Sequence, residues 1–122
     1  MKHHIKIPRV LTAYIDARAD GNADMAANCC SDGVIMRGPM GEFSGLESVK
    51  ERAFSRKSQP ISRELTKLEY QPQLSTPGAA VYAREFEATI GEKQVPLRQE
   101  FTVENPESYH AKVSLVVFSK LG

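Results

Sequence analysis

The order of helical and strand patterns along this chain leaves few folds open. Residues 10–54 carry two helical patterns, a short β-branched run, a glycine-rich turn and a third helical pattern. Beyond Pro60, four segments alternate or run apolar between turn signals, near residues 62–71, 79–90, 94–104 and 109–120. This order predicts a single α+β domain over residues 1–122, with three N-terminal helices packed on a curved, mainly antiparallel sheet.

The first helical pattern shows one buried stripe. Its apolar residues recur three and four positions apart, at Ile7, Val10, Leu11, Tyr14 and Ile15. The fixed φ of proline suits a first helical position, so Pro8 is expected to begin this helix. Gly21 is expected to end it, and Asn22 is expected to cap a second, short helix.

The second helix is expected to end near Ser31 and Asp32 and to bury an apolar stripe of Met25 and Cys29. The two cysteines of the chain, Cys29 and Cys30, are adjacent. Neighbouring cysteines cannot close a disulfide without a strained ring, so the pair indicates a reducing compartment. It also lacks the C-x-x-C spacing and the second ligand pair of a zinc site, so no metal is expected.

The β-branched run at residues 34–36 predicts a strand. A start signal for the third helix follows it. Ser44 and Glu47 fit the capping box S-x-x-E, in which each of the two side chains pairs with a backbone amide. Apolar residues then recur at helical spacing, at Leu46, Val49, Ala53 and Phe54.

The hairpin formed by the segments near residues 79–90 and 94–104 has a predictable register. Gly91-Glu92 suits a two-residue type II′ turn, because glycine takes the positive φ at the first central position. The resulting cross-strand pairs all match: Glu85 with Arg98, Phe86 with Leu97, Tyr82 with Phe101 and Ala88 with Val95. A one-residue slip would set Phe86 against Arg98, and a two-residue slip would set Glu85 against Glu100.

This register separates a polar face of the hairpin from an apolar face that is expected to line the core. The apolar face holds Tyr82, Phe86, Ala88, Val95, Leu97, Phe101 and Val103. Two polar residues, Arg84 and Gln99, interrupt it as direct neighbours. A guanidinium on an apolar face is costly unless it is paired. Arg84 therefore meets a ligand anion, meets a carboxylate such as Asp16 or Asp32, or extends to the rim of the sheet.

The last strand segment is apolar on both faces. Strict alternation directs one set toward the core, namely Ala111, Val113, Leu115 and Val117. It leaves Val116 and Phe118 on the opposite, convex face. A strand that is apolar on both faces indicates a second covering layer, so we expect a homodimer through the convex face of the sheet.

Composition argues against several kinds of partner. The 16 basic and 15 acidic side chains are interspersed, and the net charge of +1 offers no field that would attract nucleic acid or an anionic membrane. No apolar run approaches the ~20 residues of a membrane span. The basic residues at the start of the chain are not followed by the apolar region of a secretory signal, so a cytoplasmic location is expected.

The stretch from Val10 to Phe54 resembles the opening of the nuclear transport factor 2-like superfamily, the cone-shaped, cystatin-like fold of SnoaL-like polyketide cyclases and ketosteroid isomerases. The resemblance lies in the first amphipathic helix, the Gly-Asn-Ala-Asp break at 21–24, and the strand closed by glycines at 38–41 and 44–45. It implies a pocket between the first helix, the strand after the second helix and the concave sheet face. Because one scaffold hosts many activities, it implies no single reaction.

The resemblance directs a set of side chains toward that pocket. Candidates for catalysis are Tyr14, Asp32 and Arg84, and candidates for ligand binding are Met36, Arg37, Tyr82, Gln99 and Phe101. In ketosteroid isomerases, a tyrosine of the first helix donates to the oxyanion and an aspartate shuttles the proton. Tyr14 matches the tyrosine, but Arg37 stands where the aspartate is expected and cannot act as a base. That isomerase chemistry is therefore not expected, and Tyr14 can also be interpreted as a core tyrosine.

Two further patterns are open to two interpretations each. Arg98-x-Glu100 resembles the Arg-x-Asp pair of limonene epoxide hydrolase, but it is also typical of a solvated ladder with Glu85 and Glu87. His110 is a candidate base near the mouth of the cone. It is also typical of a residue at a loop edge, since catalysis needs a partner that orients the imidazole.

Two functions of different classes follow from the sequence. One is a cofactor-independent isomerase, cyclase or dehydratase of the SnoaL-like type, which uses acid/base chemistry and needs no metal or organic cofactor. The other is a noncatalytic ligand-binding or dimerisation module. For both functions we expect a small hydrophobic or carboxylate-bearing molecule as the partner. Only the enzyme needs a carboxylate or histidine within about 3 Å of the reactive atom of the ligand.

Overall fold

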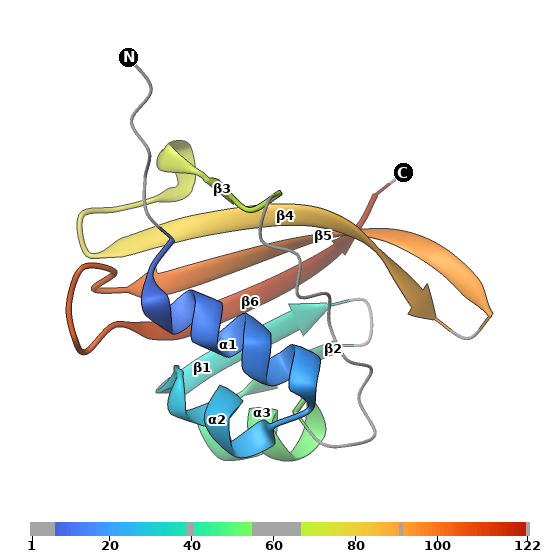
Figure 1. Ribbon diagram of the computed structural model, residues 1–122, viewed down its shortest axis with the longest axis horizontal. Helices are drawn as coiled ribbons and strands as arrows, with labels where there is room; N and C mark the ends of the chain where they lie inside the picture. Colours follow the sequence, from blue (N-terminus) through green and yellow to red (C-terminus); the bar gives the residue numbers. More distant parts are fainter. Residues whose placement is uncertain (1–6, 39–40, 55–66, 91, 122) are drawn as a thin grey trace.

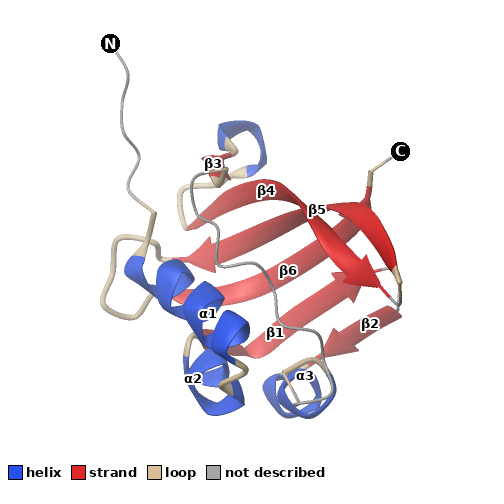
Figure 2. Ribbon diagram, turned by 45° about the vertical axis from the view of Figure 1, so that its right-hand side comes forward, coloured by secondary structure: helices blue, strands red, loops and turns tan. Residues whose placement is uncertain are grey.

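The computed structural model describes residues 7–38, 41–54, 67–90 and 92–121. Within these ranges, three α-helices lie on one face of a curved, open six-stranded sheet (Figures 1 and 2). The helices are α1 (Arg9–Asp20), α2 (Ala23–Asn28) and α3 (Leu46–Arg52). The strands are β1 (Cys30–Gly38), β2 (Gly41–Ser44), β3 (Glu69–Tyr70), β4 (Ala79–Ile90), β5 (Lys93–Glu104) and β6 (Lys112–Lys120). The expected α+β class is confirmed.

The sheet has the order β2-β1-β6-β5-β4-β3, so strands from the two ends of the chain meet at its centre. β6 pairs with β1 in parallel, with Cys30 opposite Val113 and Arg37 opposite Val117, whereas all other neighbours are antiparallel. Of the segment expected as a strand near 62–71, the described part, 67–71, contributes the two residues of β3. The first part of that segment, 62–66, lies outside the described residues. None of the described helices is long and apolar enough to cross a membrane.

The register predicted for the β4–β5 hairpin is confirmed. Glu85 lies opposite Arg98, and Ile90 lies opposite Lys93, which leaves two residues for the turn. Gly91 lies outside the described residues, so the turn type stays a prediction. The predicted apolar face of the hairpin is buried at Tyr82, Leu97, Phe101 and Val103, whereas Phe86, Ala88 and Val95 are only half-buried. Arg84 and Gln99 lie on this face, 2% and 0% exposed.

The faces predicted for β6 are wrong beyond its first residues. The pairing of β6 with β5 shifts by one residue, so that Val103 lies opposite Val113 but Thr102 lies opposite Leu115. An extra residue in one strand reverses the alternation of side chains beyond it. Val116 is therefore fully buried opposite Phe101, and Phe118 packs against the core. Leu115 and Val117 take the outward positions that alternation had given to Val116 and Phe118.

α1 ends as predicted but begins one residue later, at Arg9, because Pro8 has an extended backbone, with ψ 142°. Pro8 directly precedes its first residue, and Gly21 ends it in the left-handed region, with φ 72°. The next cap is also confirmed, because the side chain of Asn22 accepts a hydrogen bond of 3.1 Å from the Met25 amide.

The rest of α2 differs from the prediction. This helix ends at Asn28 rather than near 31–32, and Cys30 already belongs to β1. Cys29 is buried as predicted, but Met25 is 48% exposed, and Ala26 and Ala27 are buried in place of Met25. A helix this short can bury either set of residues. The direction from which its neighbours pack decides between them.

The capping box predicted for α3 is absent. Ser44 belongs to β2, where it pairs with Ile35, and α3 starts without a side-chain cap. Gly45 connects β2 to α3 instead, with φ 90°. Its amide donates to the Val34 carbonyl at 2.9 Å. The serine is held by the strand pairing and is not placed as a cap. The apolar stripe of α3 is nevertheless buried through Val49, and Phe54 follows it into the core.

Candidate functional site

Tyr14 lies at the centre of the interior, between α1 and the concave face of the sheet. It is fully buried, and its ring meets Phe54 and Phe101 edge-on at centroid distances of 5.8 and 6.0 Å. One turn further along α1, Nη1 of Arg18 donates a hydrogen bond of 3.0 Å to the hydroxyl oxygen of Tyr14. The Arg18 side chain is 8% exposed, and its guanidinium lies 4.8 Å from the centre of the Phe54 ring. Tyr14 and Arg18 therefore form a buried polar pair within an aromatic cluster.

The surroundings of Tyr14 keep its hydroxyl protonated. Burial raises the pKa of Tyr14 to about 12, and the guanidinium of Arg18 opposes that rise only in part. The Cys30 thiol adds to the increase, while Arg84 lowers the pKa of Tyr14 from the sheet side. A phenol with this pKa is a hydrogen-bond donor at neutral pH and not a base.

Arg84 and Gln99 form a second buried polar pair, carried by neighbouring positions of β4 and β5. Nε of Arg84 donates to Oε1 of Gln99 at 2.9 Å. The guanidinium lies 5.0 Å from the centre of the Phe86 ring and 5.6 Å from that of Phe101. Among the residues that the structure describes, no acceptor lies within hydrogen-bonding reach of the buried Nε2 of Gln99. Phe101 thus lies between the two polar pairs.

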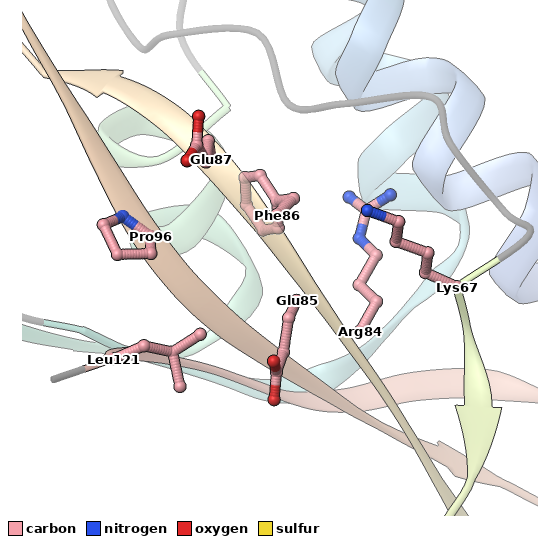
Figure 3. Close-up of a pocket in the computed structure, with 7 residues that line it drawn as sticks. All are labelled: Lys67, Arg84, Glu85, Phe86, Glu87, Pro96 and Leu121. Atoms are coloured by element: carbon pink, nitrogen blue, oxygen red, sulfur yellow. The ribbon is translucent and has the colours of Figure 1, made fainter.

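A hollow of about 520 Å³ opens beside Arg84. It is lined by Lys67, Arg84, Glu85, Phe86, Glu87, Pro96 and Leu121 (Figure 3). Arg84 and Glu85 extend from β4 to opposite sides, and Lys67 lies on the side of Arg84 (Figure 3). A second hollow of about 360 Å³ shares Lys67, Arg84 and Glu85 with the first. The volume of the larger one falls in the range of ligand pockets, about 300–1,000 Å³.

The remaining predicted site residues are divided between the interior and the surface. Tyr82 is buried, with its ring 5.6 Å from that of Tyr70, and Met36 is a core residue. Asp32 is exposed on β1, whereas Tyr14 is fully buried. Arg37 is half-exposed and forms an ion pair with Glu42. The structure therefore brings together Tyr14, Arg84, Gln99 and Phe101, with Tyr82 and Met36 in the same core, and leaves Asp32 and Arg37 outside.

The other candidates for chemistry lie on the surface. Arg98 bonds both Glu85, at 3.4 Å, and Glu100, at 3.2 Å, as in the solvated ladder that the sequence allowed. His110 is exposed at the turn before β6. In the described part of the chain, the buried polar and charged residues apart from tyrosine and cysteine are Arg18, Arg84 and Gln99. The described interior thus offers hydrogen-bond donors rather than a carboxylate or imidazole base.

The two cysteines are buried and unoxidised. Burial raises the pKa of Cys30 to about 12, and its thiol donates to the Ala26 carbonyl at 3.3 Å. Burial also raises the pKa of Cys29. Because the thiolate is the nucleophilic form, neither residue is suited to nucleophilic chemistry at neutral pH.

Sequence reasoning missed Arg18. The signal was present, because Arg18 follows Tyr14 by four residues and so shares its helix face. Charged residues are rarely buried, so an arginine at the end of an amphipathic stripe is ordinarily assigned to the surface. Its burial depends on Phe54, which a distant part of the chain supplies.

Comparisons with known proteins support the fold. No family model matches the sequence, and no curated protein matches it. A nuclear transport factor 2-like protein of unknown function from Cytophaga hutchinsonii aligns with a TM-score of 0.66 at 13% identity, over 99% of this chain and 95% of that one. A ketosteroid isomerase-like protein from Erwinia carotovora atroseptica aligns with a TM-score of 0.64 at 14% identity, over 93% and 92%.

A longer protein contains the same fold. The canthaxanthin-binding orange carotenoid protein of Anabaena aligns with a TM-score of 0.72 at 12% identity, over 99% of this chain but only 38% of that one. At these identities the similarity establishes architecture and not activity. The chain has the nuclear transport factor 2-like fold that the stretch from Val10 to Phe54 predicted.

Proposed function

We propose that this chain with the nuclear transport factor 2-like fold binds a small molecule with an apolar body and a carbonyl or carboxylate oxygen. The observation that carries the proposal is the amide nitrogen of Gln99. Its side chain is fully buried, and no acceptor in the described part of the chain reaches it. An unsatisfied buried donor costs about 1–3 kcal/mol, and a ligand oxygen would remove that cost.

The orientation of the Gln99 amide follows from its partner. A guanidinium only donates hydrogen bonds, so the atom facing Nε of Arg84 at 2.9 Å has to be the amide oxygen. The NH₂ group is then directed away from Arg84. Phe86 and Phe101 on the same face offer aromatic surface for an apolar ligand body. The canthaxanthin-binding neighbour supports a small-molecule role for this architecture.

A binding module fits the described site better than an enzyme. The expected acid/base chemistry needs a proton acceptor beside the ligand. Tyr14 with its pKa of about 12 remains protonated, and Asp32 is exposed on β1. Catalysis by a SnoaL-like mechanism remains a second candidate function, favoured by the buried phenol of Tyr14, which could donate to a developing oxyanion.

Three naphthalene probes of similar shape test the binding proposal: 2-naphthoate, 2-acetylnaphthalene and 2-ethylnaphthalene. We expect the two probes with acceptor oxygens to bind at least tenfold more tightly than the ethyl compound, in titrations followed by NMR. Gln99→Leu is expected to reduce that preference. Equal affinity for all three probes, or no binding of any, contradicts the proposal.

Arg84→Met provides the second variant, because it keeps most of the side-chain stem and removes the donor that orients Gln99. We expect the affinity for 2-naphthoate to fall about tenfold while the chain stays folded. Arg98→Met is the matched control, since Arg98 lies on the opposite face of the same hairpin. It is expected to leave the affinity unchanged.

A further inference from the structure

The hydrogen bond between Arg18 and Tyr14 has only one possible direction. A guanidinium has no acceptor, so the Tyr14 oxygen accepts from Nη1 of Arg18 over the 3.0 Å contact. The hydroxyl proton of Tyr14 is thereby turned away from Arg18. Arg84 fixes the Gln99 amide in the same manner from the opposite wall. Each arginine donates a hydrogen bond to the oxygen of its partner side chain. The Tyr14 hydroxyl proton and the Gln99 NH₂ group are then directed away from the arginines as donors.

Both donors lie next to the same ring. Phe101 meets Tyr14 edge-on at 6.0 Å and follows Gln99 by two residues on one face of β5. Tyr14, Gln99 and Phe101 are each fully buried. A group that enters beside Phe101 would thus meet hydrogen-bond donors and aromatic surface.

The charge on Arg18 adds a preference for negative oxygen. None of the ion pairs between described residues includes Arg18. Its guanidinium lies near the rings of Tyr14 and Phe54, whose π faces attract the cation without neutralising its charge. A positive charge bonded to the Tyr14 oxygen makes the hydroxyl a stronger donor, because charge-assisted hydrogen bonds polarise one another.

We infer that Arg18 is a positioning residue that holds the Tyr14 hydroxyl as a donor to an anionic oxygen of the ligand. The site would then select carboxylates over alcohols and amines. This inference rests on the proposed function, since it assigns a second contact to the same ligand. An amine could not accept from either donor once protonated, and it would also face the Arg18 charge. A carboxylate has two oxygens and can accept from more than one donor.

The test measures binding of 2-naphthoate and 2-ethylnaphthalene to the full chain by NMR titration. Tyr14→Phe removes the donor and keeps the ring. It is expected to weaken 2-naphthoate about tenfold and to leave 2-ethylnaphthalene within about twofold. Equal weakening of both probes would show that Tyr14 serves only as packing, and would overturn the inference.

Arg18 variants separate positioning from simple stabilisation. Arg18→Met is expected to weaken 2-naphthoate about as much as Tyr14→Phe, and Arg18→Lys, which retains a cationic donor, is expected to recover part of the loss. The double variant that combines Tyr14→Phe with Arg18→Met should bind no more weakly than either single variant, because Arg18 acts through Tyr14. Additive losses would show independent roles and contradict the inference.

The controls also separate this inference from the proposed function. If wild type does not bind 2-naphthoate, both fail. If Gln99→Leu weakens 2-naphthoate while Tyr14→Phe does not, the proposed function stands and the role of Arg18 and Tyr14 is wrong. Should Arg18→Met fail to fold, which thermal unfolding would reveal, Tyr14→Phe and Arg18→Lys still decide the outcome.

Discussion

At the scale of single residues, the interior is defined by arginines that control the direction of their neighbours' hydrogen bonds. Arg18 and Arg84 each donate to a buried oxygen, on Tyr14 and on Gln99. Both guanidiniums also lie over aromatic rings. Arginine suits such a position better than lysine, because a guanidinium is less strongly hydrated than an ammonium group and stacks on aromatic faces. The consequence is an interior with fixed donors, which is the basis for the proposed ligand.

Tyr14 also predicts how stability depends on alkaline pH. Its pKa is raised from the ordinary 10.0 to about 12 in the folded chain. Below pH 10 the phenol is protonated in both states. Between pH 10 and 12 the unfolded chain loses this proton while the folded chain keeps it, so stability falls as pH rises.

We therefore expect Tyr14→Phe to flatten the alkaline decline by as much as about 1.4 kcal/mol per pH unit in this range. Urea unfolding at half-unit pH steps above pH 9.5 measures this decline in the unfolding free energy. Tyr109→Phe is the control, since Tyr109 is fully exposed. An equal alkaline slope in wild type and Tyr14→Phe would show that Tyr14 titrates normally.

At the scale of helices and strands, the two helix starts make a matched comparison. Asn22 caps α2 through its side chain, whereas Ser44 lies in β2 and makes no cap for α3. We expect Asn22→Ala to cost about 1 kcal/mol of unfolding free energy and Ser44→Ala less than about 0.5 kcal/mol. Urea denaturation of both variants checks this. A comparable loss for Ser44→Ala would show that Ser44 caps α3, as the sequence suggested.

The shifted register of β6 makes a second comparison between neighbours. Val116 is fully buried, and Val117 lies on the other face. We expect Val116→Ala to cost about 2 kcal/mol, through lost burial and the cavity it leaves, and Val117→Ala to cost less than about 1 kcal/mol in the monomer. Urea unfolding at low protein concentration distinguishes them. The reverse order would support strict alternation along β6.

At the scale of the whole molecule, the convex face still carries apolar residues of β6, but these are Leu115 and Val117 rather than the Val116 and Phe118 that the sequence suggested. The pairings place Ile35, Leu115, Thr102 and Val81 in one row across β1, β6, β5 and β4. The next row runs from Arg37 through Val117 to Glu100. A two-fold axis that lies in the plane of the interface, along the strand direction, would reverse the second row and bring Arg37 toward Glu100 of the other copy.

We propose a homodimer through this face, with Leu115 near its centre. Sedimentation at micromolar concentration is expected to give a dimer for wild type and a monomer for Leu115→Glu, because a buried unpaired carboxylate opposes association. Met25→Glu is the control, since Met25 is exposed on α2, on the opposite side of the sheet. A monomeric wild type, or a Leu115→Glu variant that remains dimeric, contradicts this interface.

The sequence by itself determined the elements whose signals are local. Gly21 and Asn22 mark helix ends through their own backbone and side-chain preferences, and they do so in the structure. The β4–β5 register was readable because a period of two residues and the charge pairing of Glu85 with Arg98 leave no equally good slip. That register placed Arg84 and Gln99 together on the apolar face, which is half of the candidate site.

Tertiary structure alone decided features for which the sequence offers equivalent choices. Along β6, Val113, Leu115, Val116 and Val117 are all apolar, so the pattern cannot show where the register shifts. In α2, either Met25 or the two alanines could have faced inward, and packing of the neighbouring elements chose the alanines. Arg18 became part of the interior because Phe54, 36 residues later, covers it. Hydrophobic pattern specifies which side chains tend to be buried, but the partner that buries each one comes from elsewhere in the chain.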